Sequence, residues 1–155
     1  MKALLISIVL CPYSLLSQND TTQHFPSVDF INQPIAWDKS NNATILLEQC
    51  KIPSGMHWNV CDSPTSRISL SNIHDLSFLL SSTSGEYMTY LKLYRLNVTK
   101  KKRYATSKMV ASDQVQLNIK KLSDDVYELV PLLFLEKGEY AFIDINAISY
   151  SFRID

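Results

Sequence analysis

The sequence predicts an all-β protein: a single antiparallel β-sandwich or barrel-like domain that follows a signal peptide. Short segments rich in Tyr, Val and Ile recur roughly every 8–12 residues between turn residues, which is typical of β-sandwiches and barrels. No segment keeps the apolar 3.6-residue period of an amphipathic helix. Hydrophobic residues make up 46% of the 155 residues and charged residues 19%, a balance that argues against a disordered chain.

The first 17 residues have the pattern of a secretory signal peptide. Residues 3–10 form an apolar run with Ser7 as its one polar residue, and Pro12 ends it. The run is too short to cross a bilayer, which takes about 20 residues. We therefore expect cleavage after Ser17, export to the periplasm, outer membrane or cell exterior, and a mature protein that does not span the membrane. A lipid-modified Cys11 is the alternative.

After residues 1–17 the sequence predicts a flexible, polar lead-in over residues 18–32 and one β domain over residues 33–155. In the first half of the domain, the turn residues Pro53-Ser54-Gly55 separate two strand segments, which predicts a hairpin. The strands expected in this half are, in order, 44–50, 56–60, 67–70 and 75–80.

The second half of the domain alternates more clearly. In the segment 90–98 the apolar phase shifts near Tyr94, which predicts a bulge or a strand with two partly buried faces. Pro131 ends a strand because it has no N–H to donate to a ladder. In the last strand Tyr150, Phe152 and Ile154 are expected to face inward, and Ser149, Ser151 and Arg153 outward. The strands expected in this half are 90–98, 115–119, 126–130, 139–143 and 149–154.

The charge balance says little about partners except at one place. Fifteen Lys and Arg match fifteen Asp and Glu, and this zero net charge argues against a nucleic-acid partner. A run of basic residues at the end of the 90–98 strand predicts either an anion-binding patch or a solvated hairpin turn whose lysines block edge pairing. The patch would consist of Lys100, Lys101, Lys102 and Arg103.

Two cysteines follow the signal peptide, Cys50 and Cys61. In an oxidising compartment the pair can form one disulfide, and two separate buried thiols are the alternative. The short loop that a bridge would close corresponds to about 3 kcal/mol in the chain-entropy model. Their spacing is not that of a metal site, so we expect neither a metal nor another cofactor.

Residues that could carry catalysis are few and scattered. His57 lies in an expected strand and His74 precedes an aspartate, but no G-x-S-x-G elbow or other nucleophile motif accompanies them. We assign no catalytic residue, and a secreted hydrolase using His57 or His74 remains an alternative. Trp37 and Trp58 could form a sugar-stacking platform or belong to the core.

The end of the chain resembles a known group of proteins. Residues 127–131 (YELVP), 135–142 (LEKGEYAF) and 151–155 (SFRID), with LYRL at 93–96 before KKR, are similar to a family of small exported, mostly uncharacterised all-β proteins of Bacteroides-type bacteria. The resemblance implies an all-β fold and an envelope or secreted location, and it implies no activity. Arg153 stands where that family usually has Gly.

The physical interpretation of this ending is structural. We expect Gly138 to take a positive φ in a turn and Glu139 to accept a hydrogen bond from a neighbouring strand or a lysine. Tyr140 and Phe142 would pack on one face of a central strand, with Ala141 and Ile143 on the other. Phe152 and Asp155 complete the motif.

The sequence therefore favours a non-catalytic binding or interaction module of the cell envelope, with a glycan or a protein as its partner. This hypothesis predicts an aromatic or basic patch on one sheet face or at a loop end. The alternatives are the hydrolase above and a structural subunit of an envelope assembly, which would show an unpaired edge strand or a large apolar face.

Overall fold

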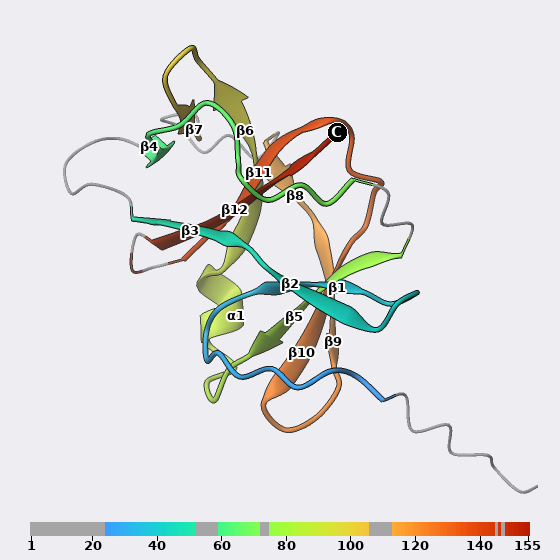
Figure 1. Ribbon diagram of the computed structural model, residues 1–155. Coiled ribbons are helices and arrows are strands. Elements are labelled where there is room, and N and C mark those ends of the chain that lie inside the picture. The colour runs from blue at the N-terminus through green and yellow to red at the C-terminus, as the bar shows by residue number, and fades with distance from the viewer. Residues whose placement is uncertain (1–23, 52–58, 72–74, 106–112, 145, 147) are drawn as a thin grey trace, which may run out of the picture.

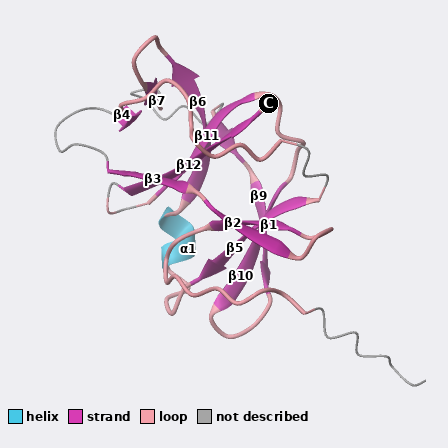
Figure 2. Ribbon diagram, in the orientation of Figure 1, coloured by secondary structure: helices cyan, strands magenta, loops and turns pink. Residues whose placement is uncertain are grey.

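The computed structural model describes residues 24–51, 59–71, 75–105, 113–144, 146 and 148–155, and the prediction of an all-β protein is confirmed (Figures 1 and 2). One four-residue helix, α1 (Tyr87–Tyr90), interrupts the strands. No helix in the described part of the chain has the length and apolar character needed to cross a membrane. The strands are β1 (Ile35–Asp38), β2 (Ala43–Leu46), β3 (Glu48–Lys51), β4 (Asn59–Cys61), β5 (Leu76–Ser81), β6 (Lys92–Val98), β7 (Arg103–Tyr104), β8 (Gln114–Val115), β9 (Leu117–Lys121), β10 (Val126–Pro131), β11 (Gly138–Ile143) and β12 (Ile148–Ile154).

Two antiparallel sheets form a nearly closed barrel. One has the order β2-β1-β5-β10-β9 and the other the order β3-β12-β11-β6-β7-β4, with β8 also paired to β6. Only Leu47 separates β2 from β3, and only Gln116 separates β8 from β9. Each of these strand pairs therefore passes from one sheet to the other, and the ladders run almost completely around the barrel (Figure 1).

The main core lies between the two sheets and is centred on aromatic rings. Phe78 of β5 lies 4.9 Å from the ring of Phe142 and 5.1 Å from that of Phe152, measured between centroids. Tyr140 stacks on Phe152 at 5.6 Å. Phe78, Phe142 and Phe152 are all fully buried, so these residues of three different strands hold the sheets together.

A second core lies on the other face of the larger sheet, because that sheet curls over itself. Ala141 and Ile143 of β11 pack there, whereas Tyr140 and Phe142 face the main core, as predicted. The two partly buried faces expected for β6 are also confirmed, since Leu93 joins the main core and Tyr94 the second.

The predicted outward row of β12 is wrong for its two serines. Ser149 and Ser151 have no exposed surface. They face the second core, where the Ser149 hydroxyl group lies 3.2 Å from the carbonyl oxygens of both Cys50 in β3 and Val60 in β4 and shares its one hydrogen between them. Small side chains on this face leave room for the curled sheet to approach closely.

The disulfide that the sequence allows is present, and the described parts of the predicted hairpin, β3 and β4, do not pair with each other; its turn and the rest of its second strand lie outside the described residues. Cys50 and Cys61 are bridged, with their Cα atoms 5.6 Å apart. Their strands do not form a ladder with each other: β3 pairs with β12 and β4 with β7. They are the two end strands of the larger sheet. The disulfide therefore joins the ends of this sheet and closes it around the second core.

Two further expectations concern the backbone of Gly138 and the residue at which the packed domain begins. Gly138 has the predicted positive φ, 156°, and a Cβ there would lie 3.3 Å from Nε of Arg95. The packed domain begins before residue 33, because Phe25 and Val28 already pack against the cluster around Trp37. The predicted signal peptide, residues 1–17, lies outside the described residues.

Candidate functional site

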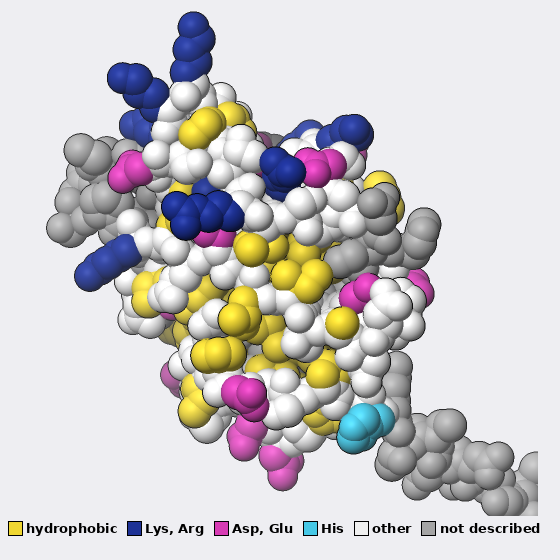
Figure 3. All heavy atoms as spheres, viewed as in Figure 1, with side chains coloured by type: hydrophobic (Ala, Val, Ile, Leu, Met, Phe, Trp, Pro, Cys, Tyr) yellow, Lys and Arg dark blue, Asp and Glu magenta, His cyan; other side chains and the backbone are white. Residues whose placement is uncertain are grey.

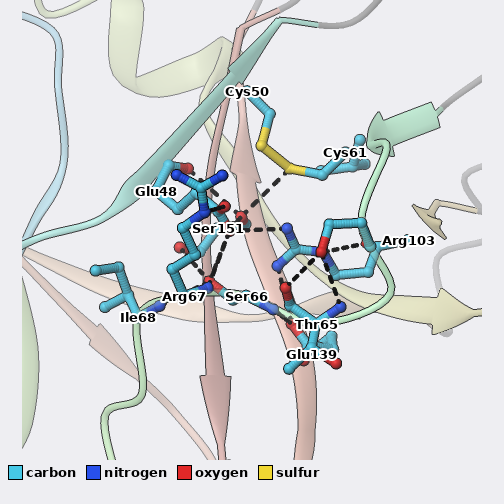
Figure 4. Close-up of polar contacts among 12 residues, drawn as sticks. Glu48, Cys50, Cys61, Thr65, Ser66, Arg67, Ile68, Arg103, Glu139 and Ser151 are labelled. Atoms are coloured by element: carbon cyan, nitrogen blue, oxygen red, sulfur yellow. Dashed lines mark hydrogen bonds and ion pairs between the residues drawn. A yellow bond between two sulfur atoms is a disulfide. The ribbon is translucent and has the colours of Figure 1, made fainter. Parts of the chain in front are cut away.

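The most conspicuous polar group is an ion-paired cluster inside the second core (Figure 4). Arg103 has no exposed surface and donates to both Glu48, at 2.8 Å, and Glu139, at 3.0 Å. Its Nε donates to the carbonyl oxygen of Ser63 at 3.1 Å. The backbone N–H of Ser66 donates to Glu139 and its hydroxyl group donates to Glu48. One buried cation therefore faces two carboxylates, each held by further donors.

The alternation of side chains in the strands explains how this cluster assembles. Glu48 and Cys50 are two residues apart in β3, so both face inward. Glu139 is on the same face of β11 as Ala141, and Arg103 of β7 is two residues before Ala105; both alanines belong to the second core. The cluster is thus the polar end of the second core, and the disulfide lies beside it.

Electrostatics favour the ionised form of this cluster. Burial alone raises the pKa of Glu48, but hydrogen bonds from Arg103 and Ser66 and the charge of Arg103 outweigh it and hold the pKa below its ordinary value. Glu48 is therefore a carboxylate throughout the physiological range.

The chemistry open to this cluster is limited by burial and pairing. Arg103, Ser66 and Ser151 are buried, and the donors around Glu48 are already used. Glu48, Cys50 and Cys61 bring three atoms that can bind a metal within 4.8 Å of one another. Two of these atoms are bonded to each other as a disulfide, and the third faces the Arg103 charge. The cluster is suited to holding strands together.

The predicted basic patch is divided by the structure. Lys100 and Lys101 are exposed in the turn between β6 and β7, where the Thr99 hydroxyl accepts from the N–H groups of Lys101 and Lys102. Figure 3 shows Lys and Arg side chains projecting from this end of the molecule. Including Arg103 in the patch was wrong, because its guanidinium is buried against two carboxylates.

The other predicted residues are placed as follows. His57, His74 and Trp58 lie outside the described residues. Trp37 is only 3% exposed, and its indole N–H donates to Asn42 at 3.3 Å. It therefore belongs to the core and cannot stack on a sugar. Phe152 is in the main core, and Asp155 accepts from the Ser69 hydroxyl at 2.9 Å.

A surface feature that sequence reasoning missed lies between β10 and β11. Leu132, Leu133 and Phe134 are 62%, 79% and 89% exposed. We call these three residues the apolar loop. Isolated exposed hydrophobic side chains are ordinary, but three consecutive ones on a connecting loop are unusual. The sequence signal was visible as an apolar run after Pro131, too short to be a helix.

The apolar loop is fixed at both ends. On its N-terminal side the N–H of Leu132 donates to the carbonyl oxygen of Gln116 at 2.9 Å. On its C-terminal side Leu135 is buried in the main core, and the Tyr140 hydroxyl donates to the carbonyl oxygen of Glu136 at 2.8 Å. The loop is therefore anchored to the barrel while its three apolar side chains face solvent.

A groove of about 610 Å³ lies beside the apolar loop, which forms one of its walls. The other walls are largely apolar and include Leu70, Leu76 and Ile154. Asp155 also lines the groove and accepts a hydrogen bond from the Ser69 hydroxyl group. This hydrogen bond is the largest influence on the pKa of Asp155 and holds it below the ordinary value. The remaining lining residues are Lys39, Ser71, Asp75, Val130, Pro131, Leu135 and Lys137.

Comparisons with protein-family models, with curated proteins and with solved structures found no match to this chain.

Proposed function

We propose that this protein is an exported, non-catalytic interaction module of the cell envelope that binds a protein partner through the apolar loop. The observation that carries the proposal is the exposure of Leu132, Leu133 and Phe134 on an anchored loop next to a groove. Contiguous exposed apolar surface is costly in water and is typical of interaction sites. A loop end with an aromatic residue is the kind of patch that the sequence hypothesis predicts.

The surface favours a protein over a glycan. Glycan sites offer flat aromatic faces for sugar rings, whereas two of the three loop residues are leucines, and Trp37 is buried. An apolar centre with a charged rim, supplied here by residues such as Lys137 and Asp155, is the usual anatomy of a protein interface.

Export is supported by two independent features. The first 17 residues have the composition of a signal peptide, and the chain carries the Cys50–Cys61 disulfide, which persists in oxidising compartments and is rare in the cytosol. Mass spectrometry of the protein from its producing cells is expected to show an N-terminus at Gln18. A protein that keeps Met1 would contradict export by cleavage.

The binding proposal is tested by photo-crosslinking inside the producing cells. A benzophenone amino acid at position 134 is expected to form a discrete adduct with a protein. The matched control is the same amino acid at position 90, where Tyr90 is 51% exposed on α1. Adducts of equal yield from both positions, or none from position 134, would contradict a binding role for the loop.

A further inference from the structure

The apolar loop borders a groove of the same chain, so one patch carries both projecting apolar side chains and a largely apolar hollow. The loop projects its three side chains into solvent, and the groove next to it is a hollow with largely apolar walls. We propose that the groove receives the apolar loop of a second copy of this chain, in a two-fold symmetric dimer. This inference rests on the proposed function and names the partner of the same surface.

Symmetry follows from the position of the two features on one patch. A two-fold rotation brings each loop to the groove of the other copy, so one contact satisfies both surfaces and the assembly closes at two chains. The groove volume of about 610 Å³ lies within the range that accommodates several side-chain-sized groups.

The area of the contact suits a dimer that dissociates on dilution. From the exposed fractions of Leu132, Leu133 and Phe134 and ordinary side-chain areas, each loop presents on the order of 300 Å². Two loops and the groove walls that they cover then bury on the order of 1,000 Å², which is the size of a weak, reversible interface.

The charges around the groove allow the patch to face a copy of itself. Lys39 is paired with Glu128 and Asp155 with Arg153 inside the chain, and the other charged residues of the groove, Lys137 and Asp75, have opposite signs, so two copies meet without an excess of like charge. An anionic bilayer would instead be favoured by a basic rim. A flat lipid surface also cannot enter a concave groove and bury its apolar walls.

Sedimentation velocity over a concentration series tests the proposal on the oxidised, exported protein. The wild type is expected to sediment as a dimer that dissociates on dilution. Phe134→Glu and Leu133→Glu are each expected to raise the dimer dissociation constant at least about 100-fold, because a two-fold contact repeats every substitution. Tyr90→Glu, on the exposed end of α1, is the control and should change it less than about 3-fold.

Each other outcome overturns the dimer. A wild type that stays monomeric, with a crosslink from position 134 to a different protein, leaves the proposed function standing and assigns the groove to that protein. Flotation of the wild type, but not of Phe134→Glu, with phosphatidylcholine vesicles assigns the loop to a lipid surface. A dimer that persists in both loop variants has its interface elsewhere. No crosslink and no dimer contradict both the inference and the proposed function.

Discussion

Replacing Arg103 by Met tests whether the buried cluster stabilises the fold. The substitution keeps an unbranched apolar side chain but leaves Glu48 and Glu139 without the cation that contacts both. Removing one partner of a buried ion pair costs about 3–5 kcal/mol, because the remaining charge stays buried and uncompensated. We expect a loss of that size in the free energy of unfolding at about pH 7.

Arg67→Met is the matched control. The Arg67 guanidinium also approaches Glu48, at 3.7 Å, but its side chain is 90% exposed. An exposed pair contributes about 0–1 kcal/mol, so this variant should unfold close to the wild type. The comparison separates burial of the cation from the mere presence of a positive charge near Glu48.

The stability difference between Arg103→Met and the wild type should become smaller as the pH falls. In the wild type the pKa of Glu48 is below its ordinary value of 4.5, so the stability that it contributes is present above that value and is lost as the pH falls through the folded-state pKa. Without Arg103 the main influences that lower this pKa are gone and burial raises it. Arg103→Met therefore gains stability as the pH falls, and the difference between its unfolding free energy and that of the wild type decreases.

Urea denaturation at several pH values, followed by tryptophan fluorescence, measures this gap. A gap at about pH 7 below about 1 kcal/mol would show that the cluster is not a major stabilising element. A gap that stays constant down to about pH 4.5 would refute the assignment of the effect to Glu48. The double variant Arg103→Met/Glu48→Gln should recover part of the loss, because it removes one uncompensated charge.

Three further substitutions test other parts of the fold. Replacing Cys50 and Cys61 by Ser should lower the unfolding free energy by about 3 kcal/mol, seen as an earlier urea midpoint that reduction of the wild type reproduces. Phe152→Ala should cost about 3–5 kcal/mol, because it empties the centre of the main core; a smaller loss in the same assay would mean that the core collapses around the gap. Tyr87→Phe should lower stability by about 1 kcal/mol, since it removes a hydrogen bond to buried Asp144. An unchanged melting temperature would contradict that role.

Strands could be predicted from the sequence where side chains of different type alternate within a single segment. The faces of β11 could be predicted because the aromatic Tyr140 and Phe142 alternate with the aliphatic Ala141 and Ile143, and successive side chains of a strand point to opposite faces. The disulfide could be proposed because only two cysteines follow the predicted signal peptide. Its place in the fold could not, because β3 and β4 pair with distant strands.

The apolar loop shows a different limit. Leu132, Leu133 and Phe134 read in the sequence like any short buried run, and nothing local distinguishes an apolar segment that packs from one that projects. Leu135, the next residue, is buried. The difference depends on where β10 ends and on how the chain returns to β11, which is a property of the assembled barrel.

By itself the sequence determined the fold class, the positions of most strands and the pair of cysteines, because these depend on local alternation and on counting. Tertiary structure alone decided that Arg103 is a buried partner of two carboxylates rather than part of a surface patch. Its partners lie 55 and 36 residues away along the chain. A charged side chain can be buried only where opposite charges meet it, and that meeting exists only when the larger sheet curls over and its two end strands are joined.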